Sequence, residues 1–255
     1  MQDPESPLPL AAPCRSVSAR APLGWVSAGW RDFRAAPGVS LAYGLGIFLI
    51  SAAVSGLAWW LGTYVLVLAM LSGFIFIAPL LATGMYSISR QLGRGERPSM
   101  IRSLRQMRLV LRDGLVFALV LMVIFLVWVR AGAMVHVFFP PGETLDWFAL
   151  VRFLVIGSVV GSIFALITFA AAAFSLPMIV DRDADMITAC ITSANAVLRN
   201  KPAMAVWIGL IVLLTGLGFA TAGLALIVVI PLLGYATWHA YVEAIDAGQW
   251  PKSSD

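Results

Sequence analysis

The chain has 255 residues, of which 60% are apolar and only 12% are charged, and its mean hydropathy is +0.91. A soluble domain carries about 25% charged residues. This composition excludes an ordinary water-soluble protein and indicates that lipid covers most of the surface.

The first residues differ from the rest of the chain. The stretch "MQDPESPLPLAAPCRSVS" is rich in proline and small polar residues, which predicts a disordered tail at residues 1–18. It has no apolar stretch after a basic start, so we expect neither a signal peptide nor a lipoprotein leader. Residues 19–246 are predicted to form the membrane domain, and residues 247–255 a C-terminal tail.

Apolar segments long enough to cross a bilayer follow the tail. Crossing the ~30 Å hydrocarbon core takes about 20 helical residues, and helices are expected because backbone amides find no water partner in lipid. The last two segments adjoin without a polar linker, so a tight turn is expected near "FATAG" (219–223). The segments are residues 39–61, 64–88, 115–137, 153–180, 203–221 and 222–244. The predicted fold class is therefore all-α, a polytopic membrane protein with six transmembrane helices.

A basic amphipathic stretch, "SMIRSLRQMRLVLRDG" (99–114), precedes the third segment. A basic amphipathic helix lies along the membrane interface, with its arginines against anionic headgroups. The stretch "LGWVSAGWRDF" (23–33) has similar spacing. We interpret both as topological anchors, and recognition of a specific lipid or acidic partner is the alternative. On a helical wheel, an apolar arc holds Met100, Leu104, Met107, Val110 and Leu111. A basic arc holds the candidate lipid or partner contacts Arg102, Arg105, Arg108 and Arg112.

Three entries into the membrane resemble one another: "DFRAAP" (32–37), "LRDG" (111–114) and "LRNKP" (198–202). In the first and third, a glycine (Gly44 or Gly209) follows the proline by seven residues. This pattern predicts three like-oriented helical hairpins, each introduced by an interfacial segment, although chance similarity of Leu/Ala/Gly-rich helices is the alternative. Each returning helix also contains a proline, namely Pro79, Pro177 and Pro231.

The cationic residues predict the orientation. Of the 17 lysines and arginines, all but Arg130 and Arg152 fall on one side of the predicted helices. The positive-inside rule makes that side cytoplasmic. Both termini are then expected in the cytoplasm, in a multi-pass protein of a bacterial inner membrane.

The aspartates of "SLPMIVDRDADMIT" (175–188) could hold a metal ion or start a helix. An EF-hand loop from Asp181 would need a glycine at its sixth position and a carboxylate at its twelfth, but these positions hold Met186 and Thr192. Aspartate is a good N-cap. We therefore interpret the aspartates as ending one helix, capping the next, and pairing with Arg182 or nearby arginines.

Two features lie inside the apolar segments. Arg130 is a candidate intramembrane polar site, because ionisable groups in a membrane are often functional, and snorkelling or pairing with Glu143 or Asp146 is the structural alternative. Small residues four apart allow helices to approach closely. Gly157, Gly161 and Ala165 therefore form a candidate helix-packing seam, either inside the chain or toward an oligomer or partner.

No constellation of catalytic residues is recognisable. Cys14 and Cys190 lack metal-site spacing and are expected to be free thiols, and His136 and His239 fall near opposite membrane faces. His239 is interpreted as an interfacial residue beside Trp238 and Tyr241. We expect no enzyme activity, no metal and no cofactor.

The stretches "GWRDFRAAPGVSLAYGL" and "LPMIVDRDADMITACITSANAVLRNKPAMAVW" resemble a bacterial integral-membrane family, domain-of-unknown-function 2189. The resemblance covers about residues 24–246. It implies a six-helix inner-membrane protein and carries no catalytic residues over to this chain.

Two functions remain open. The first is a non-catalytic accessory, assembly or membrane-organising subunit. The second is a small transporter or channel, and the scarcity of polar groups in the helix centres then favours an apolar, lipid-like or small uncharged solute. Expected partners are anionic headgroups on the cytoplasmic face and a membrane complex or homo-oligomer, with no nucleic acid.

Overall fold

The structure, a computed structural model, describes residues 9–61, 81–137 and 147–253. This part of the chain is all-α, and its only strand-like features are two isolated β-bridges. Residues 81–93 are helical. The other helices are α1 (Ala21–Ala35), α2 (Pro37–Leu61), α4 (Met100–Leu109), α5 (Leu111–Val137), α6 (Trp147–Ala172), α7 (Ser175–Asp181), α8 (Met186–Arg199), α9 (Lys201–Ala220) and α10 (Leu226–Ala244).

Five stretches among the described residues are long and apolar enough to cross a membrane, and each overlaps a predicted segment. The predicted segment 64–88 lies mostly outside the described residues, as does Pro79. The five stretches are Pro37–Leu57, Leu111–Ala131, Val155–Asp181, Lys201–Ala220 and Leu226–Ala244. The predicted all-α, multi-pass architecture is confirmed at this level.

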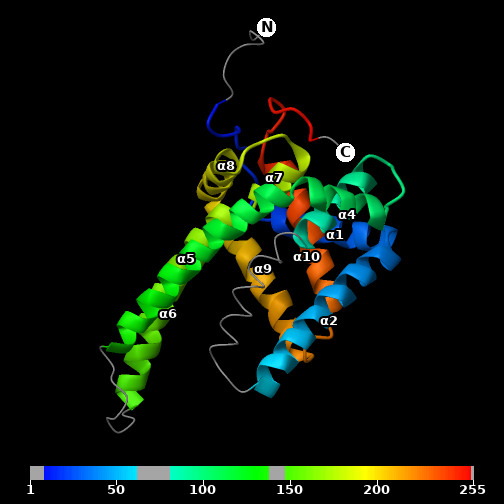
Figure 1. Cartoon of the computed structure of the whole chain (residues 1–255). Helices are drawn as coiled ribbons and strands as arrows, with labels where there is room; N and C mark the ends of the chain where they lie inside the picture. Colours follow the sequence, from blue (N-terminus) through cyan, green and yellow to red (C-terminus); the bar gives the residue numbers. More distant parts are fainter. Residues whose placement is uncertain (1–8, 62–80, 138–146, 254–255) are drawn as a thin grey trace.

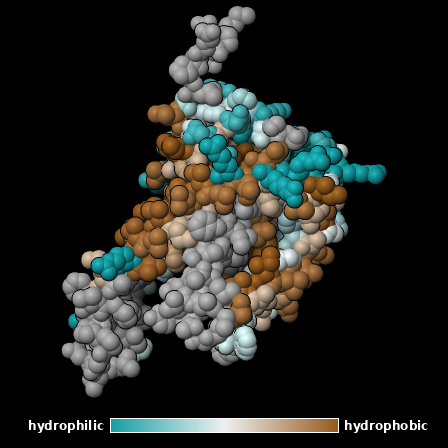
Figure 2. Space-filling view, viewed as in Figure 1, coloured by the Kyte–Doolittle hydropathy of each residue, from teal (hydrophilic) through white to brown (hydrophobic). Residues whose placement is uncertain are grey.

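The short helices α1, α4, α7 and α8 gather at one end of the molecule, together with the described residues of both chain ends (Figure 1). We call this the polar end. Hydrophilic residues concentrate there, and apolar residues cover the long helices (Figure 2). The α5–α6 pair diverges from α9 with distance from the polar end (Figure 1).

The three predicted entries share one local geometry. In each, a single residue separates a short helix at the polar end from a spanning helix: Ala36 between α1 and α2, Val110 between α4 and α5, and Asn200 between α8 and α9. The break residue donates its N–H to the carbonyl four residues earlier, and its own carbonyl accepts the N–H four residues later. The bonds are Ala36 to Asp32 and Ser40 to Ala36, Val110 to Gln106 and Gly114 to Val110, and Asn200 to Ala196 and Met204 to Asn200. We call these joints the elbows.

The predicted helix at 153–180 is interrupted. It breaks after Ala172, and Ser175 begins α7. Ser193 of α8 inserts at the break, where its hydroxyl accepts from the Phe174 N–H (3.0 Å) and donates to the Ala170 carbonyl (2.7 Å). A side chain inserted into the backbone ladder is a recognised cause of a kink. The helix therefore breaks a few residues before Pro177.

The tightest packing joins α10 to α1 and α2. A side chain at Gly29 would place its Cβ 2.8 Å from the Ala236 nitrogen, and one at Gly44 would collide with the Ile227 carbonyl oxygen. Trp25 of α1 packs edge-on against Trp207 of α9, with ring centroids 5.7 Å apart. The core of the described residues lies around α1, α7, α8, α10 and the start of α9.

The expected turn between the last two spans is present. Thr221 follows α9, and its hydroxyl accepts from the Ala225 N–H at 2.9 Å. Ala222 and Gly223 have positive φ angles of 52° and 88°. This geometry reverses the chain without polar linker residues.

The prediction of a disordered tail is wrong for the described residues that precede α1. The Ala12 N–H donates to the Thr192 hydroxyl (2.9 Å), and the Arg15 N–H donates to the Ala244 carbonyl (2.8 Å). Asn200 accepts from the Val17 N–H (2.8 Å) and donates to the Arg15 carbonyl (3.0 Å). These bonds hold the segment against α8 and the end of α10, so composition alone misjudged it.

Candidate functional sites

The four candidate contact arginines, Arg102, Arg105, Arg108 and Arg112, all have exposed side chains. Arg102 pairs with Glu96, also near the surface. Three of the four arginines lie on α4, and Arg112 lies at the start of α5. Ser99 caps α4, and its hydroxyl accepts a hydrogen bond from the Arg102 N–H. The exposed basic face that we predicted from the sequence is therefore present.

The face that α4 turns toward the protein is polar, which corrects the predicted apolar arc. Ser103 is fully buried and Gln106 is 3% exposed, whereas Leu104 is 45% exposed. Of the predicted arc, only Val110 is fully buried, with Met100 and Met107 partly so. The apolar side chains beside the arginines thus point away from the protein core.

The buried face of α4 belongs to a layer of polar side chains. The Ser103 hydroxyl donates to the Gly84 carbonyl and shares a hydrogen bond with the Tyr43 hydroxyl, both at 2.7 Å. Arg90 donates to the Gln106 amide oxygen (3.1 Å) and to the Val180 carbonyl (2.8 Å). The layer therefore connects α4 with α2, α7 and the helix at residues 81–93.

Sequence reasoning missed this layer. Arg90 follows the predicted segment 64–88 and was counted only among the cations of the basic side, but its side chain is buried. Thr83, Ser87, Arg90 and Gln91 recur at helical spacing, and all four are buried. A polar stripe with that period, at the end of an apolar segment, was the signal that could have found it.

A second polar cluster joins α1 to α10. His239 Nε2 lies 2.8 Å from Asp32 Oδ2, and the Ser89 hydroxyl donates to the same carboxylate oxygen. Ser89 is 1% exposed, and the side chains of Asp32 and His239 are 15% and 33% exposed. The neighbouring rings of Trp238 and Tyr241 pack against each other, with their centroids 5.6 Å apart. The contact of His239 with Asp32 was not predicted from the sequence.

The three aspartates have separate structural contacts. Asp181 accepts from Arg182 Nε (2.8 Å) and from the Tyr241 hydroxyl (2.9 Å). The Asp183 N–H donates to the Pro251 carbonyl. Asp185 caps α8, as predicted, and its hydrogen bonds from the Thr188 hydroxyl and the Thr188 and Ile187 N–H groups lower the pKa of its carboxyl. Within the described residues, no group of three or more Asp, Glu, His or Cys side chains is placed to hold a metal ion.

Both cysteines are free and half-buried. The Cys14 thiol lies 3.7 Å from the Thr192 carbonyl oxygen, inside the docked N-terminal segment. Burial is the main cause that raises the pKa of both thiols. They are therefore less ionised near neutral pH than a solvated cysteine.

Arg130 has an exposed side chain in the half of α5 remote from the polar end. It follows Trp128 by two residues, which places the two on opposite faces of a helix with 3.6 residues per turn. Its suggested partners Glu143 and Asp146 lie outside the described residues, as does the side chain of His136.

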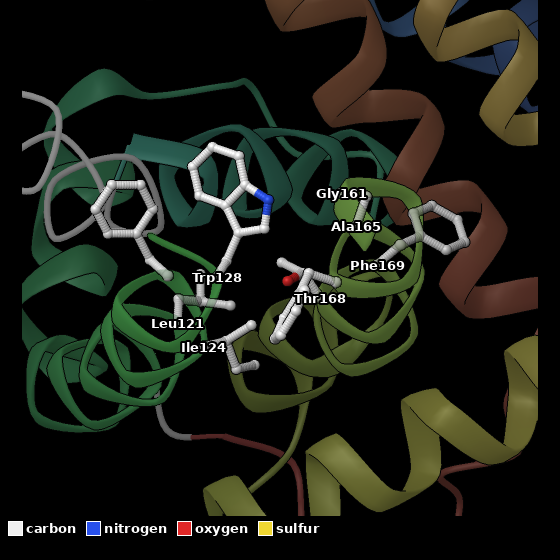
Figure 3. Close-up of a pocket in the computed structure, with 9 residues that line it drawn as sticks. Leu121, Ile124, Trp128, Gly161, Ala165, Thr168 and Phe169 are labelled. Carbon is white, nitrogen blue, oxygen red and sulfur yellow. The ribbon is translucent and has the colours of Figure 1, made fainter. Parts of the chain in front are cut away.

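Two of the three candidate seam residues, Gly161 and Ala165, border a pocket between α5 and α6 (Figure 3). The cavity is about 510 Å³ in volume. Gly161 and Ala165 line it, and the nearest atom to a Cβ built on Gly161 is the Trp128 ring nitrogen at 3.7 Å. A Cβ on Gly157 would meet no described atom within 4 Å. The other lining residues are Leu121, Ile124, Phe125, Trp128, Phe164, Thr168 and Phe169.

Comparison with known families supports the predicted resemblance. Residues 66–181 match the model of a family described as "Predicted integral membrane protein (DUF2189)", a shorter stretch than the one we expected. No curated protein and no solved structure matches the chain.

Proposed function

We propose that this chain, which matches the model of the family DUF2189 over residues 66–181, is a non-catalytic accessory or membrane-organising subunit of a bacterial inner membrane. The observation that carries the proposal is the set of three elbows. A transporter needs spanning helices that move, whereas α1, α4 and α8 each join a spanning helix through one hydrogen-bonded residue. Such joints suit a protein that is seated in the interface and presents a fixed surface.

The exposed faces of these helices combine apolar and cationic side chains. Leu23 and Trp30 of α1 are exposed beside Arg31 and Arg34. This composition suits insertion among headgroups, where the apolar side chains reach the acyl boundary and the cations meet anionic lipid. On α4 the exposed pair is Ile101 with Arg102, and on α8 it is Leu198 with Arg199.

The proposal places the polar end in the cytoplasm, because all cationic residues except Arg130 and Arg152 belong to that side and the positive-inside rule makes that side cytoplasmic. A reporter enzyme that is active only in the periplasm tests this. Fused after Asp255, it should give no signal, and strong activity would overturn the orientation.

The interaction of the arginines with lipid is tested in nanodiscs that contain phosphatidylglycerol. Each basic residue near an anionic surface contributes about 1 kcal/mol, and salt weakens the attraction. Replacing Arg102, Arg105 and Arg108 by glutamine should lower the enrichment of phosphatidylglycerol around the protein step by step, while lysine should preserve it. Arg130→Gln and Arg152→Gln, on the other side, are the matched controls. If a single Arg→Lys change abolishes enrichment, the surface is a bidentate recognition site and not a general anchor.

A transporter or channel for an apolar, lipid-like or small uncharged solute is the second candidate, and the apolar pocket between α5 and α6 favours it. The two functions differ in whether the protein moves lipid from one leaflet to the other. Purified protein in vesicles that moves a fluorescent lipid between leaflets faster than protein-free vesicles would favour the second candidate, whereas lipid enrichment without such movement would favour the first.

A further inference from the structure

We propose that the pocket between α5 and α6 binds one acyl chain of a membrane lipid. This proposal concerns a site inside the spans and does not depend on the arginines of the polar end. Pockets of about 300–1,000 Å³ with apolar and aromatic linings are typical ligand sites, and this one has a volume of about 510 Å³.

The lining matches a hydrocarbon chain. Side chains of Leu, Ile, Phe, Trp and Ala, together with Gly161, form nearly all of it. The polar side-chain atoms are the Thr168 hydroxyl and the Trp128 indole nitrogen. A helical threonine can bond its own i−4 carbonyl, so Thr168 does not require a polar ligand. None of the described lining residues is charged, which disfavours an ionic solute.

The position of the pocket within the apolar stretches indicates which class of ligand can reach it. The lining segments of α5 and α6 belong to stretches that are long and apolar enough to cross a membrane. Hydrocarbon therefore surrounds the site, and lipid chains are the most abundant apolar molecules there. An aqueous solute would have to leave water to reach it.

The shape of α6 also favours an extended chain. Gly157, Gly161 and Ala165 share one face, whereas the bulky residues Val159, Ile163 and Ile167 are exposed on another face. The residues of α6 that line the pocket run from Gly161 to Phe169, about 12 Å along the helix at 1.5 Å per residue. The groove formed by the pocket therefore extends along the spanning direction, the direction in which acyl chains lie.

A second helix is a poorer occupant than an acyl chain. Close helix pairing on small residues needs backbone contact at those residues. The Trp128 ring nitrogen points toward Gly161 (Figure 3) and lies 3.7 Å from a Cβ built there. A partner backbone would have to displace this ring, whereas a flexible chain can pack against it.

The test uses the full chain in phosphatidylcholine nanodiscs that contain a phospholipid with a diazirine midway along one acyl chain. After illumination, mass spectrometry maps the labelled residues. We expect labelling at 121–128 and 161–169 to exceed labelling at the lipid-facing residues of α9 several-fold. Gly161→Leu should lower it to the α9 level, because leucine fills the groove. The variant should fold, because the one described atom within 4 Å of a Cβ at this position is the ring nitrogen of Trp128, whose side chain is exposed. Gly209→Leu, at an exposed glycine of α9 with no described atom within 4 Å of its Cβ, should leave it unchanged.

Three results would overturn the proposal. Equal labelling on α5, α6 and α9 that Gly161→Leu does not change would mean contact with bulk lipid only. Loss of labelling on Thr168→Val, which removes only the hydroxyl, would indicate a polar ligand. Absent labelling at 161–169, together with disulfide cross-linking between copies that carry Gly157→Cys, would show that a second copy of the chain covers the groove.

Discussion

His239 of α10 and Asp32 of α1 form a hydrogen-bonded pair at 2.8 Å, at the polar end of the molecule. The pair lies near the place where Gly29 lets α1 approach the α10 backbone. Ser89 donates to the same carboxylate oxygen, so one carboxylate joins α1, α10 and the helix at residues 81–93. Asp32 therefore holds three elements together where the chain first turns into a spanning helix.

Removing this carboxylate should destabilise the polar end. Asp32→Ala leaves the Ser89 hydroxyl, which is 1% exposed, without its acceptor, and a lost hydrogen bond of this kind costs about 1–3 kcal/mol. Asp32→Asn keeps an acceptor oxygen and should cost less. Thermal unfolding in detergent, followed by circular dichroism, measures both. Asp183→Ala removes an exposed carboxylate and is the control; an equal loss in that variant would refute the role of Asp32.

The docked N-terminal segment predicts that Asn200 controls access to Cys14. Asn200 is 3% exposed and bonds both Val17 and Arg15. Asn200→Ala removes two hydrogen bonds, each contributing about 1 kcal/mol, so the opened state should become roughly ten-fold or more populated. The opened thiol also loses the burial that raises its pKa. Both effects should speed maleimide labelling of Cys14.

The experiment uses a Cys190→Ala background, so that only Cys14 reacts. Asn195→Ala replaces an exposed asparagine on the same helix and should leave the rate unchanged. Equal labelling rates in the three proteins would mean that the segment opens without breaking the Asn200 contacts.

The Asp185 cap predicts a specific pH dependence. Hydrogen bonds lower the pKa of its carboxyl in the folded protein, so the stability it contributes is present above the unfolded pKa of about 3.9 and is lost as the pH falls through the lower folded value. Asp185→Asn keeps a cap and loses only the charge at the helix start, about 0.3–1 kcal/mol. Its melting temperature should lie slightly below wild type near pH 7 and converge with it below about pH 4. A gap that widens in acid would contradict this.

The sequence predicted features that depend on local chemistry and on hydropathy. The Asp185 cap, the turn at Thr221 and the short helices ahead of the spans all follow from residues that are adjacent along the chain. The buried layer around Arg90 and Ser103 was missed because it forms between distant segments. Because Ser103 lies among arginines in the sequence, it is predicted to be exposed, and its burial becomes evident only from the packing of another helix against it.

The N-terminal segment was also misjudged because its contacts are distant in sequence, here by predicting disorder where the structure is ordered. Its proline-rich composition predicts disorder, yet backbone bonds to Thr192 and Ala244 hold it. These partners lie far along the chain, and composition carries no information about them. The break before α7 likewise depends on Ser193 from another helix.

Gly44 and Gly209 occupy equivalent positions in the sequence repeat, but their packing environments differ. Each follows its proline by seven residues, so the repeat makes them equivalent. A Cβ on Gly44 would collide with the Ile227 carbonyl oxygen, whereas one on Gly209 would meet no described atom within 4 Å. The repeat therefore extends to the elbows, while the contacts beyond them differ.

We expect Gly44→Ala and Gly209→Ala to change stability in opposite directions. At Gly44 the methyl group must push α2 away from α10, and overpacking of this kind costs about 1–3 kcal/mol. At Gly209 it meets no described neighbour, and alanine in a helix is favoured over glycine by about 0.8–1.0 kcal/mol. Chemical denaturation of the two variants in one detergent measures the difference. Equal effects would mean that α2 does not approach α10 as closely as Gly44 indicates, because helix propensity alone would then account for both substitutions.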